Sequence, residues 1–371
     1  MKRSALLKAT VFALILAMLL GGCEFPFNAN NAANNEQEEL PPLIAPVHDK
    51  EDETEKAPAP LPKDPLVGDI LEEDTSMNRP YCVVIDNARA ALPARGISQA
   101  GVIFEYNVEA SVTRFLALFQ DIRGISAIGA VRSCRAIDVS INIAFDGIFT
   151  HAGGSPDGLN DIIIKHVADL DAVYGNYKFF YRDKTRRING YEHTLFTNPA
   201  QMEKLVPGIK VTRGMQHLED YKCCLRFGRQ DMSAGTEAVA VTVRMNGSKT
   251  TQFDYKEDAG CYLVSEFGDQ LIDANNNEVV AVKNVLALKV GYKVREDDKD
   301  GRKDADLTSG EGAYCTGGKI IKIRWSFSEE EGFKFNCEDG SELKLAVGGS
   351  YICLLDKESG SIEASYLIGK Q

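Results

Sequence analysis

The sequence lacks the short signatures that identify the best-known enzyme classes. It contains no GxSxG, no HExxH, no Walker P-loop and no Rossmann glycine pattern. No two of its nine cysteines have the CxxC spacing that is common in metal sites. We therefore expect no cofactor and no bound metal.

Basic residues are too few for a protein that binds nucleic acid. The 371 residues include 54 Asp and Glu against 42 Lys and Arg, which gives a formal net charge of −12. Removing residues 1–22, which carry three basic residues and no acidic ones, would take this charge to −15. Such an excess of negative charge argues against nucleic acid and against electrostatic docking on anionic lipid.

The N-terminal apolar run is too short to cross a membrane. Residues 9–20 supply about twelve apolar positions, whereas a spanning helix needs about twenty. The motif LGGC, which ends at Cys23, has the residue order of a bacterial lipobox. We predict a signal peptide over residues 1–22 and diacylation of Cys23, which would anchor the chain on the outer face of a cell membrane. An ordinary secretory signal is the alternative.

The next segment has the composition of a disordered tether. Residues 24–66 hold eight of the thirteen prolines and ten acidic residues, with few apolar residues to pack. We predict that the lipidated cysteine and the tether together occupy residues 23–66.

Residues 67–225 predict an α/β domain, a mixed sheet with flanking helices. Apolar and β-branched runs indicate strands over residues 81–86, 102–106, 113–120, 128–132 and 147–150. Helical periodicity indicates helices over residues 136–145 and 156–166, the second capped by Ser155 with Pro156 in its first turn. Asn198-Pro199 predicts a further helix start.

Residues 226–371 predict a β-rich second domain, with the boundary within residues 216–236. The expected strands are residues 239–245, 251–255, 262–267, 278–293, 319–327, 334–337, 342–347 and 351–355. The eight cysteines other than Cys23 fit buried thiols better than disulfides, and one or two disulfides are the alternative.

The first domain carries the residues that would bind an anion. Residues 79–215 hold sixteen basic and thirteen acidic residues, a net charge of +3, and eleven of the sixteen are arginine. The planar fork of arginine suits carboxylate and phosphate groups. Our ligand-binding candidates are Arg114, Arg132, Arg135 and Arg182; the alternative is that they pair with local carboxylates.

Four further residues accompany these arginines. Glu105 lies on one face of the second predicted strand and Glu109 in the turn beyond it, and the alternative for them is a solvated strand end paired with Arg114. His151 and His193 are candidate proton carriers. For His151 the alternative is a ring packed under a tight turn, and for His193 it is a surface loop.

Several ordered motifs resemble the YerB-type family of bacterial lipoproteins, whose two domains have no known function. They include Arg79-Pro80, Thr113-Arg114-Phe115, Val131-Arg132-Ser133, His151-Ala-Gly-Gly-Ser155 and Gly348-Gly349-Ser350-Tyr351. This resemblance covers about residues 67–357 and implies an envelope lipoprotein without implying a reaction. Tyr191-Glu192 departs from it, because a proline is expected before His193.

A fainter resemblance is to the LytR-CpsA-Psr glycopolymer transferases, extracytoplasmic α/β domains that hold a polyprenyl pyrophosphate on arginines near strand ends. The Asp that follows the strand-end arginine in those enzymes is Ser133 here. This departure argues against metal-assisted phosphotransfer.

These observations favour a non-catalytic protein that binds an anionic wall polymer or an envelope protein through the arginine-rich face. The rival is a phosphate-handling enzyme in which Arg114, Arg132 and Arg135 clamp the substrate and His151 or His193 is the base. A scaffold with all of its arginines paired internally is the third hypothesis.

Overall fold

The computed structural model describes residues 61–175, 177–208, 214, 225–296 and 298–365, all within one compact unit. The predicted signal peptide, Cys23, most of the tether, and the adjacent Cys223 and Cys224 lie outside these residues. No helix within the described ranges is long and apolar enough to span a membrane. The domain limit at residues 225/226 stays a prediction.

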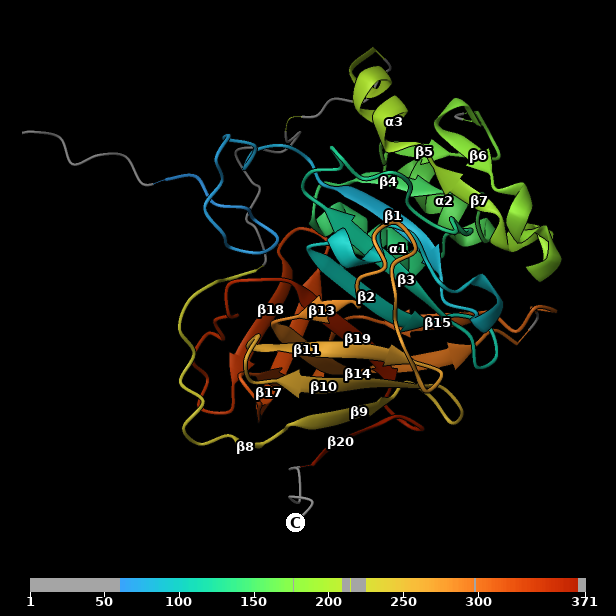
Figure 1. Ribbon diagram of the computed structural model, residues 1–371. Coiled ribbons are helices and arrows are strands. Elements are labelled where there is room, and N and C mark those ends of the chain that lie inside the picture. Colours follow the sequence, from blue (N-terminus) through green and yellow to red (C-terminus); the bar gives the residue numbers. More distant parts are fainter. Residues whose placement is uncertain (1–60, 176, 209–213, 215–224, 297, 366–371) are drawn as a thin grey trace, which may run out of the picture. The chain divides into compact units, whose positions relative to one another are not determined.

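The first half of the chain builds a mixed sheet (Figure 1). Its strands are β1 (Tyr81–Asp86), β2 (Val102–Asn107), β3 (Thr113–Phe119), β4 (Ile148–His151) and β5 (Asp169–Asp171). They lie in the order β2-β3-β1-β4-β5, with β1, β4 and β5 parallel and β3 antiparallel to both of its neighbours. A separate ribbon pairs β6 (Phe180–Arg182) with β7 (Leu195–Thr197).

Helices connect these strands and begin where the sequence predicts. The α-helices of the described residues are α1 (Ala136–Ala144), α2 (Pro156–Ile164) and α3 (Pro199–Leu205). Short 3-10 helices lie at η1 (Arg89–Ala91), η2 (Ile97–Gln99), η3 (Tyr177–Phe179), η4 (Lys184–Asn189), η5 (Tyr191–His193) and η6 (Val206–Gly208). The side chains of Ser155 and Asn198 accept N-terminal amide protons of α2 and α3, and a proline follows each of these caps.

In the described residues of the second half, every helix or strand that forms is a strand. Its elements are β8 (Thr236–Glu237), β9 (Ala240–Arg244), β10 (Thr250–Lys256), β11 (Cys261–Glu266), β12 (Asp269–Gln270), β13 (Ala281–Val282), β14 (Asn284–Val294), β15 (Lys303–Asp306), β16 (Ser309–Thr316), β17 (Lys319–Ser328), β18 (Gly332–Cys337), β19 (Ser350–Asp356) and β20 (Ser361–Ser365). A second sheet has the order β12-β11-β10-β9-β20, with β13 on β11.

The two halves share one sheet, because β19 lies between β2 and β14 and is parallel to both. The sheet therefore runs β18-β17-β16-β14-β19-β2-β3-β1-β4-β5. One core cluster contains side chains of β1, β3 and β19 together with Val241, Phe253 and Tyr262 of the second sheet. The other cluster packs α1 against alternate residues of β1 and β2. Burial between layers holds the halves together.

The predicted fold class is confirmed, and the differences concern single elements. Residues 342–347 and 128–132 make isolated bridges in place of the predicted strands. Strand β16 was not predicted because its glycines resemble a turn. In the structure, a Cβ at Gly310 would lie 2.6 Å from the Lys289 carbonyl oxygen and 2.8 Å from Nε1 of Trp325, so this position has no room for a side chain.

The described cysteines support the buried-thiol interpretation. No disulfide joins them, and four of the six are fully buried. They are Cys82, Cys134, Cys261, Cys315, Cys337 and Cys353.

Candidate functional site

Three parallel strands, β1, β4 and β5, end at one edge of the sheet, and the candidate site lies there. Their last residues are Asp86, His151 and Asp171. The segment 129–135 crosses this edge, where the backbone N–H of Arg132 donates to a β1 carbonyl at 3.0 Å. Ligands of α/β proteins commonly bind at the carboxyl ends of parallel strands.

The Asp86 carboxylate holds two of the predicted residues. Its Oδ2 lies 2.7 Å from Nδ1 of His193 and 3.4 Å from Nη1 of Arg132. The side chain of Asp86 is 3% exposed, whereas that of Arg132 is 23% exposed. Among the described residues this shared carboxylate is the only ion-pair partner of Arg132.

Arg114 and Arg135 instead converge on Glu109. Arg135 Nε donates to Glu109 Oε1 at 2.7 Å, and Arg114 Nη2 lies 3.6 Å from Glu109 Oε2. Further donors of both arginines reach the carbonyls of Ser133 and Cys134. Burial alone would raise the pKa of Glu109, but the two guanidinium groups lower it on balance. Both guanidinium groups are therefore hydrogen-bonded within the protein, and the Glu109 carboxylate balances one of their two positive charges.

Arg182 is exposed and belongs to a basic segment, residues 177–194. Its Nη1 donates to the Tyr191 carbonyl at 2.9 Å, and its guanidinium carbon lies 3.8 Å from the centre of the Tyr191 ring. The segment has five basic and two acidic residues, a net charge of +3. Tyr177 and Tyr191 are 76% and 60% exposed. The segment therefore presents both positive charge and aromatic surface.

His151 lies under a tight turn, as its alternative interpretation predicted. Its Nδ1 donates to the Gly153 carbonyl at 2.9 Å, and its Nε2 is 3.2 Å from Asp169 Oδ2. Burial alone would lower the pKa of His151, but hydrogen bonds to Asp169 and Cys134 raise it to about 10. Within the described chain no hydrogen bond or ion pair joins His151 to an arginine.

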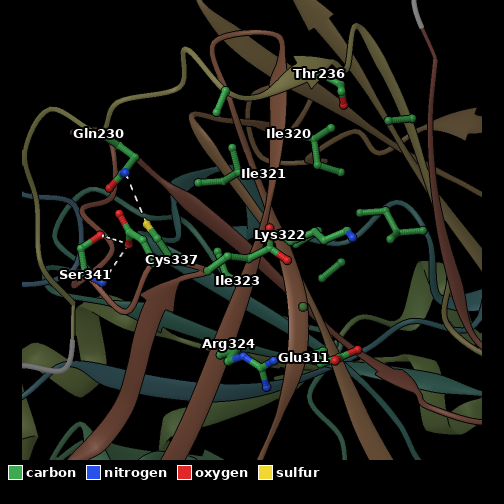
Figure 2. Close-up of a pocket in the computed structure, with 18 of the residues that line it drawn as sticks. Gln230, Thr236, Glu311, Ile320, Ile321, Lys322, Ile323, Arg324, Cys337 and Ser341 are labelled. Atoms are coloured by element: carbon green, nitrogen blue, oxygen red, sulfur yellow. Dashed lines mark hydrogen bonds between the residues drawn. The ribbon is translucent and has the colours of Figure 1, made fainter.

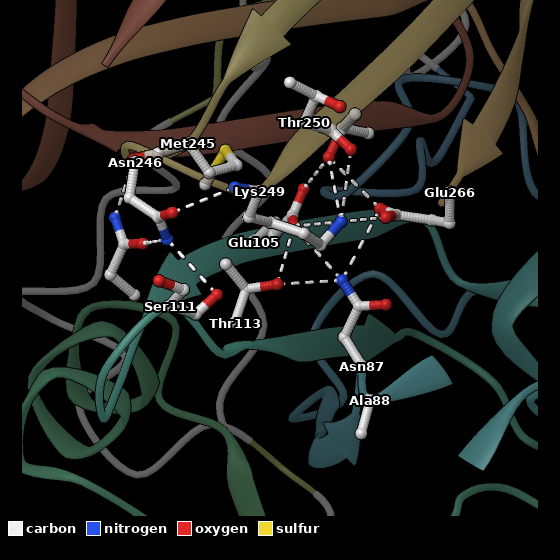
Figure 3. A network of polar contacts seen from close by, with 12 residues as sticks. Asn87, Ala88, Glu105, Ser111, Thr113, Met245, Asn246, Lys249, Thr250 and Glu266 are labelled. Atoms are coloured by element: carbon white, nitrogen blue, oxygen red, sulfur yellow. Dashed lines mark hydrogen bonds and ion pairs between the residues drawn. The ribbon is translucent and has the colours of Figure 1, made fainter. Parts of the chain in front are cut away.

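Glu105 lies in the interior, so the solvated alternative is wrong for this residue. It is 0% exposed and belongs to the polar network of Figure 3. Its carboxylate oxygens lie 2.6–3.2 Å from the side chains of Asn87, Thr113, Thr251, Tyr351 and Lys249.

The same network contains a second buried carboxyl group, Glu266. Lys249 Nζ contacts both Glu105 and Glu266. Burial and the neighbouring charge of Glu105 raise the pKa of Glu266 to about 8. Because Asn87 follows Asp86 and Thr113 precedes Arg114, this network supports the backbone beneath the candidate site.

The structure thus groups the predicted residues in distinct places. Arg132 and His193 meet at Asp86, while Arg114 and Arg135 meet at Glu109. His151 and Glu105 belong to other clusters. The sequence analysis missed Asp86, Asp169 and Asp171 as site residues, although each lies in or just after an apolar run that leads to this edge.

A separate hollow of about 990 Å³ opens in the second half of the chain, beside β16, β17 and β20 (Figure 2). Its lining mixes apolar side chains such as Ile320 and Ile323 with the charged groups of Lys322, Arg324 and Glu311. None of the predicted site residues lines it.

Comparison with known proteins agrees with this architecture. A family model described as "Protein of unknown function (DUF3048) N-terminal domain" matches residues 66–212, and the model of its C-terminal domain matches residues 241–352. The chain is 27% identical to "Putative lipoprotein YerB" of Bacillus subtilis (strain 168) over 307 residues, which is 81% of this chain and 88% of that protein. The crystal structure of YerB from Bacillus subtilis superimposes with a TM-score of 0.69 at 26% identity, covering 81% of this chain and 99% of that one.

Proposed function

Because the chain belongs to the DUF3048 family, whose function is unknown, we propose a role from the geometry of the sheet edge. In this role the protein is anchored to the envelope by its lipid. It binds an anionic wall component, or an anionic partner protein, through Arg132 and the basic segment 177–194. The binding is non-catalytic.

One observation carries this proposal: the single carboxylate that pairs with Arg132 among the described residues, Asp86, is shared with His193. Asp86 Oδ2 lies closer to the histidine, at 2.7 Å, than to the guanidinium group, at 3.4 Å. The guanidinium group is also partly exposed, unlike that of Arg114. An incoming phosphate or carboxylate would give it the two-point contact that Asp86 does not provide.

The basic segment supports the same ligand class. Its net charge of +3 contrasts with −12 for the whole chain. It lies beside Arg132, because His193 near its end contacts the same carboxylate. Arginine and tyrosine are enriched in binding surfaces, and an exposed tyrosine ring can pack on a sugar of a charged polymer.

The first prediction is that Arg132→Ala weakens polyanion binding without unfolding the protein. Losing charge-assisted hydrogen bonds worth about 1.5–3 kcal/mol lowers affinity by roughly 10- to 150-fold. A ligand at one hundred times its Kd stabilises the wild-type fold by about 2.7 kcal/mol, which a thermal-shift assay detects. The panel contains teichoic acid fragments, muropeptides and polyprenyl phosphates, tested on the mature chain in detergent.

Arg135→Ala is the matched control. It leaves Glu109 with one arginine and removes donors from two carbonyls, so it should destabilise the fold by about 1–3 kcal/mol. Its effect on ligand affinity should be small. If no anion shifts the melting temperature and Arg132→Ala is the more destabilised variant, the scaffold hypothesis replaces ours.

The second prediction concerns the anchor. Cys23→Ala should leave the precursor unacylated and uncleaved, because the thiol is the atom that takes the diacylglyceryl group. Fractionation of cells and mass spectrometry of the mature wild-type N-terminus measure this. An unmodified Cys23 in the mature chain would exclude the anchor.

A second candidate function, the phosphate-handling enzyme, has one observation in its favour. The Nδ1 of His193 is held by Asp86, while Nε2, 3.6 Å from Glu192 Oε1, is the ring nitrogen that could act as a general base near Arg132. Turnover of a polyprenyl-linked glycan that disappears in His193→Gln would support it. Binding that survives this variant without turnover supports the non-catalytic role.

A further inference from the structure

A cluster of metal-ligating side chains lies at the ends of β4 and β5, outside the proposed anion site. One ring nitrogen of His151 and one carboxylate oxygen each from Asp169 and Asp171 lie within 4.8 Å of one another. We propose that this cluster binds a single divalent metal ion, with Zn²⁺ as the best fit. This proposal is independent of the proposed function, because the cluster would bind the metal ion whether or not an anionic ligand is bound at Arg132.

The strand register places the three side chains together. Asp169 and Asp171 are two residues apart on β5, so they project from the same face, while Leu170 between them enters the core on the other face. His151 is the register partner of Asp171 on the parallel strand β4. Its Nδ1 is 3.9 Å from Asp171 Oδ2, and its Nε2 is 3.2 Å from Asp169 Oδ2.

The surroundings fix two of these side chains while leaving an atom of each for the ion. His151 Nδ1 donates to the Gly153 carbonyl at 2.9 Å, which makes Nε2 the metal-binding nitrogen. Asp171 Oδ1 accepts the backbone N–H groups of Gly153 and Val173 at 2.8 and 2.7 Å, which leaves Oδ2. Metal-binding histidines usually donate their other ring N–H to a carbonyl or carboxylate in this way.

The charge of the cluster is not balanced by the protein. Within the part of the chain that the structure describes, His151 is the only ion-pair partner of either aspartate. Even with a protonated ring the cluster keeps one negative charge. The His151 and Asp171 side chains are 0% and 6% exposed. A largely buried excess of negative charge is unfavourable, and a divalent ion would compensate it.

The donor set indicates which ion. Imidazole with two carboxylates suits Zn²⁺, whereas Mg²⁺ prefers oxygen ligands alone. The Asp169 side chain is 30% exposed and gives the ion an entry path. On binding, the ion replaces the proton between His151 Nε2 and Asp169, and that proton goes to solvent.

The test titrates Zn²⁺ into the chelator-treated mature chain by isothermal calorimetry, with Mg²⁺ as the comparison ion. We expect one Zn²⁺ per chain and at least tenfold weaker binding by Asp169→Asn. Co²⁺ serves as a spectroscopic probe, because its d–d bands should appear with the wild-type chain and be lost with this variant. Asp300→Asn removes the same charge from an exposed loop and should leave both readouts unchanged.

His151→Gln can fail to fold because the ring is buried, so Asp169→Asn decides the question, with circular dichroism confirming its fold. The proposal is overturned if the wild-type chain binds no stoichiometric Zn²⁺, or if Asp169→Asn binds it equally well. It is also overturned if binding is lost only in Cys223→Ser/Cys224→Ser, since the ion would then lie on the adjacent cysteines.

Discussion

Replacing Lys249 with methionine should lower the free energy of unfolding by about 3–5 kcal/mol. Lys249 is the only cation in contact with the buried carboxyl groups of Glu105 and Glu266 among the described residues. All three side chains are at most 4% exposed. Methionine fills a similar volume but leaves the Glu105 carboxylate without a counter-charge, so the cost is mainly electrostatic.

Urea denaturation followed by circular dichroism measures this change. Lys165→Met is the matched control, because Lys165 pairs with Asp161 and Glu329 where all side chains are 22–30% exposed. Partly exposed pairs of this kind are worth about 1 kcal/mol or less. Replacing both Glu105 and Glu266 with glutamine in the Lys249→Met protein should recover part of the free energy of unfolding that Lys249→Met loses. Equal losses for Lys249→Met and Lys165→Met would show that the buried network is not charged.

Single strands and helix starts of this fold can be predicted because the residues that specify them are adjacent in the sequence. The run YCVVID of β1 is buried throughout, and its apolar, β-branched composition identifies it as a strand. The starts of α2 and α3 follow from Ser155-Pro156 and Asn198-Pro199, since each pair supplies a cap and a preset backbone angle. Such signals need no knowledge of the rest of the chain.

The pairing of distant strands cannot be predicted in this way. Cys353 of β19 is the register partner of Glu105 of β2, although about 250 residues separate them. An apolar run indicates a strand but does not identify its neighbours, so the sequence predicts a strand at residues 351–355 without placing it between β2 and β14. The burial of Glu105 has the same origin, because Tyr351 of β19, Thr251 of the second sheet and the preceding Lys249 all contact it from far along the chain.

In the candidate site, the partners of the charged side chains also cannot be predicted from the sequence. The prevalence of arginine in residues 79–215 indicates an anionic partner, but the sequence does not say whether that partner is a ligand or a carboxylate of the protein. Glu109 compensates Arg135 from 26 residues away, whereas Arg132 shares Asp86 with His193. The geometry distinguishes Arg114 and Arg135, which are mostly buried and donate to carbonyls of the protein, from the more exposed Arg132.

The free energy of unfolding should decrease as the pH rises, and part of this decrease should come from Glu266. The pKa of Glu266 is about 8 in the folded chain against an ordinary value of 4.5, so the folded chain binds this proton more tightly than the unfolded chain. Its contribution is therefore complete below about pH 4.5 and is lost as the pH rises through 8. The loss should be on the order of a few kcal/mol.

Glu266→Gln keeps the side chain neutral at every pH and should remove this loss. Its free energy of unfolding, measured in urea at pH 5, 6.5 and 8, should fall less than that of the wild-type chain, and the difference should be largest at pH 8. Glu278→Gln, on an exposed turn, is the control and should keep the wild-type slope. Because the other titrating groups are shared by all three proteins, the difference between their slopes isolates Glu266. Identical slopes for Glu266→Gln and the wild-type chain would mean that this carboxyl group is already ionised at pH 5. Lys249 would then balance two negative charges, and the Lys249→Met loss should approach the upper end of its range.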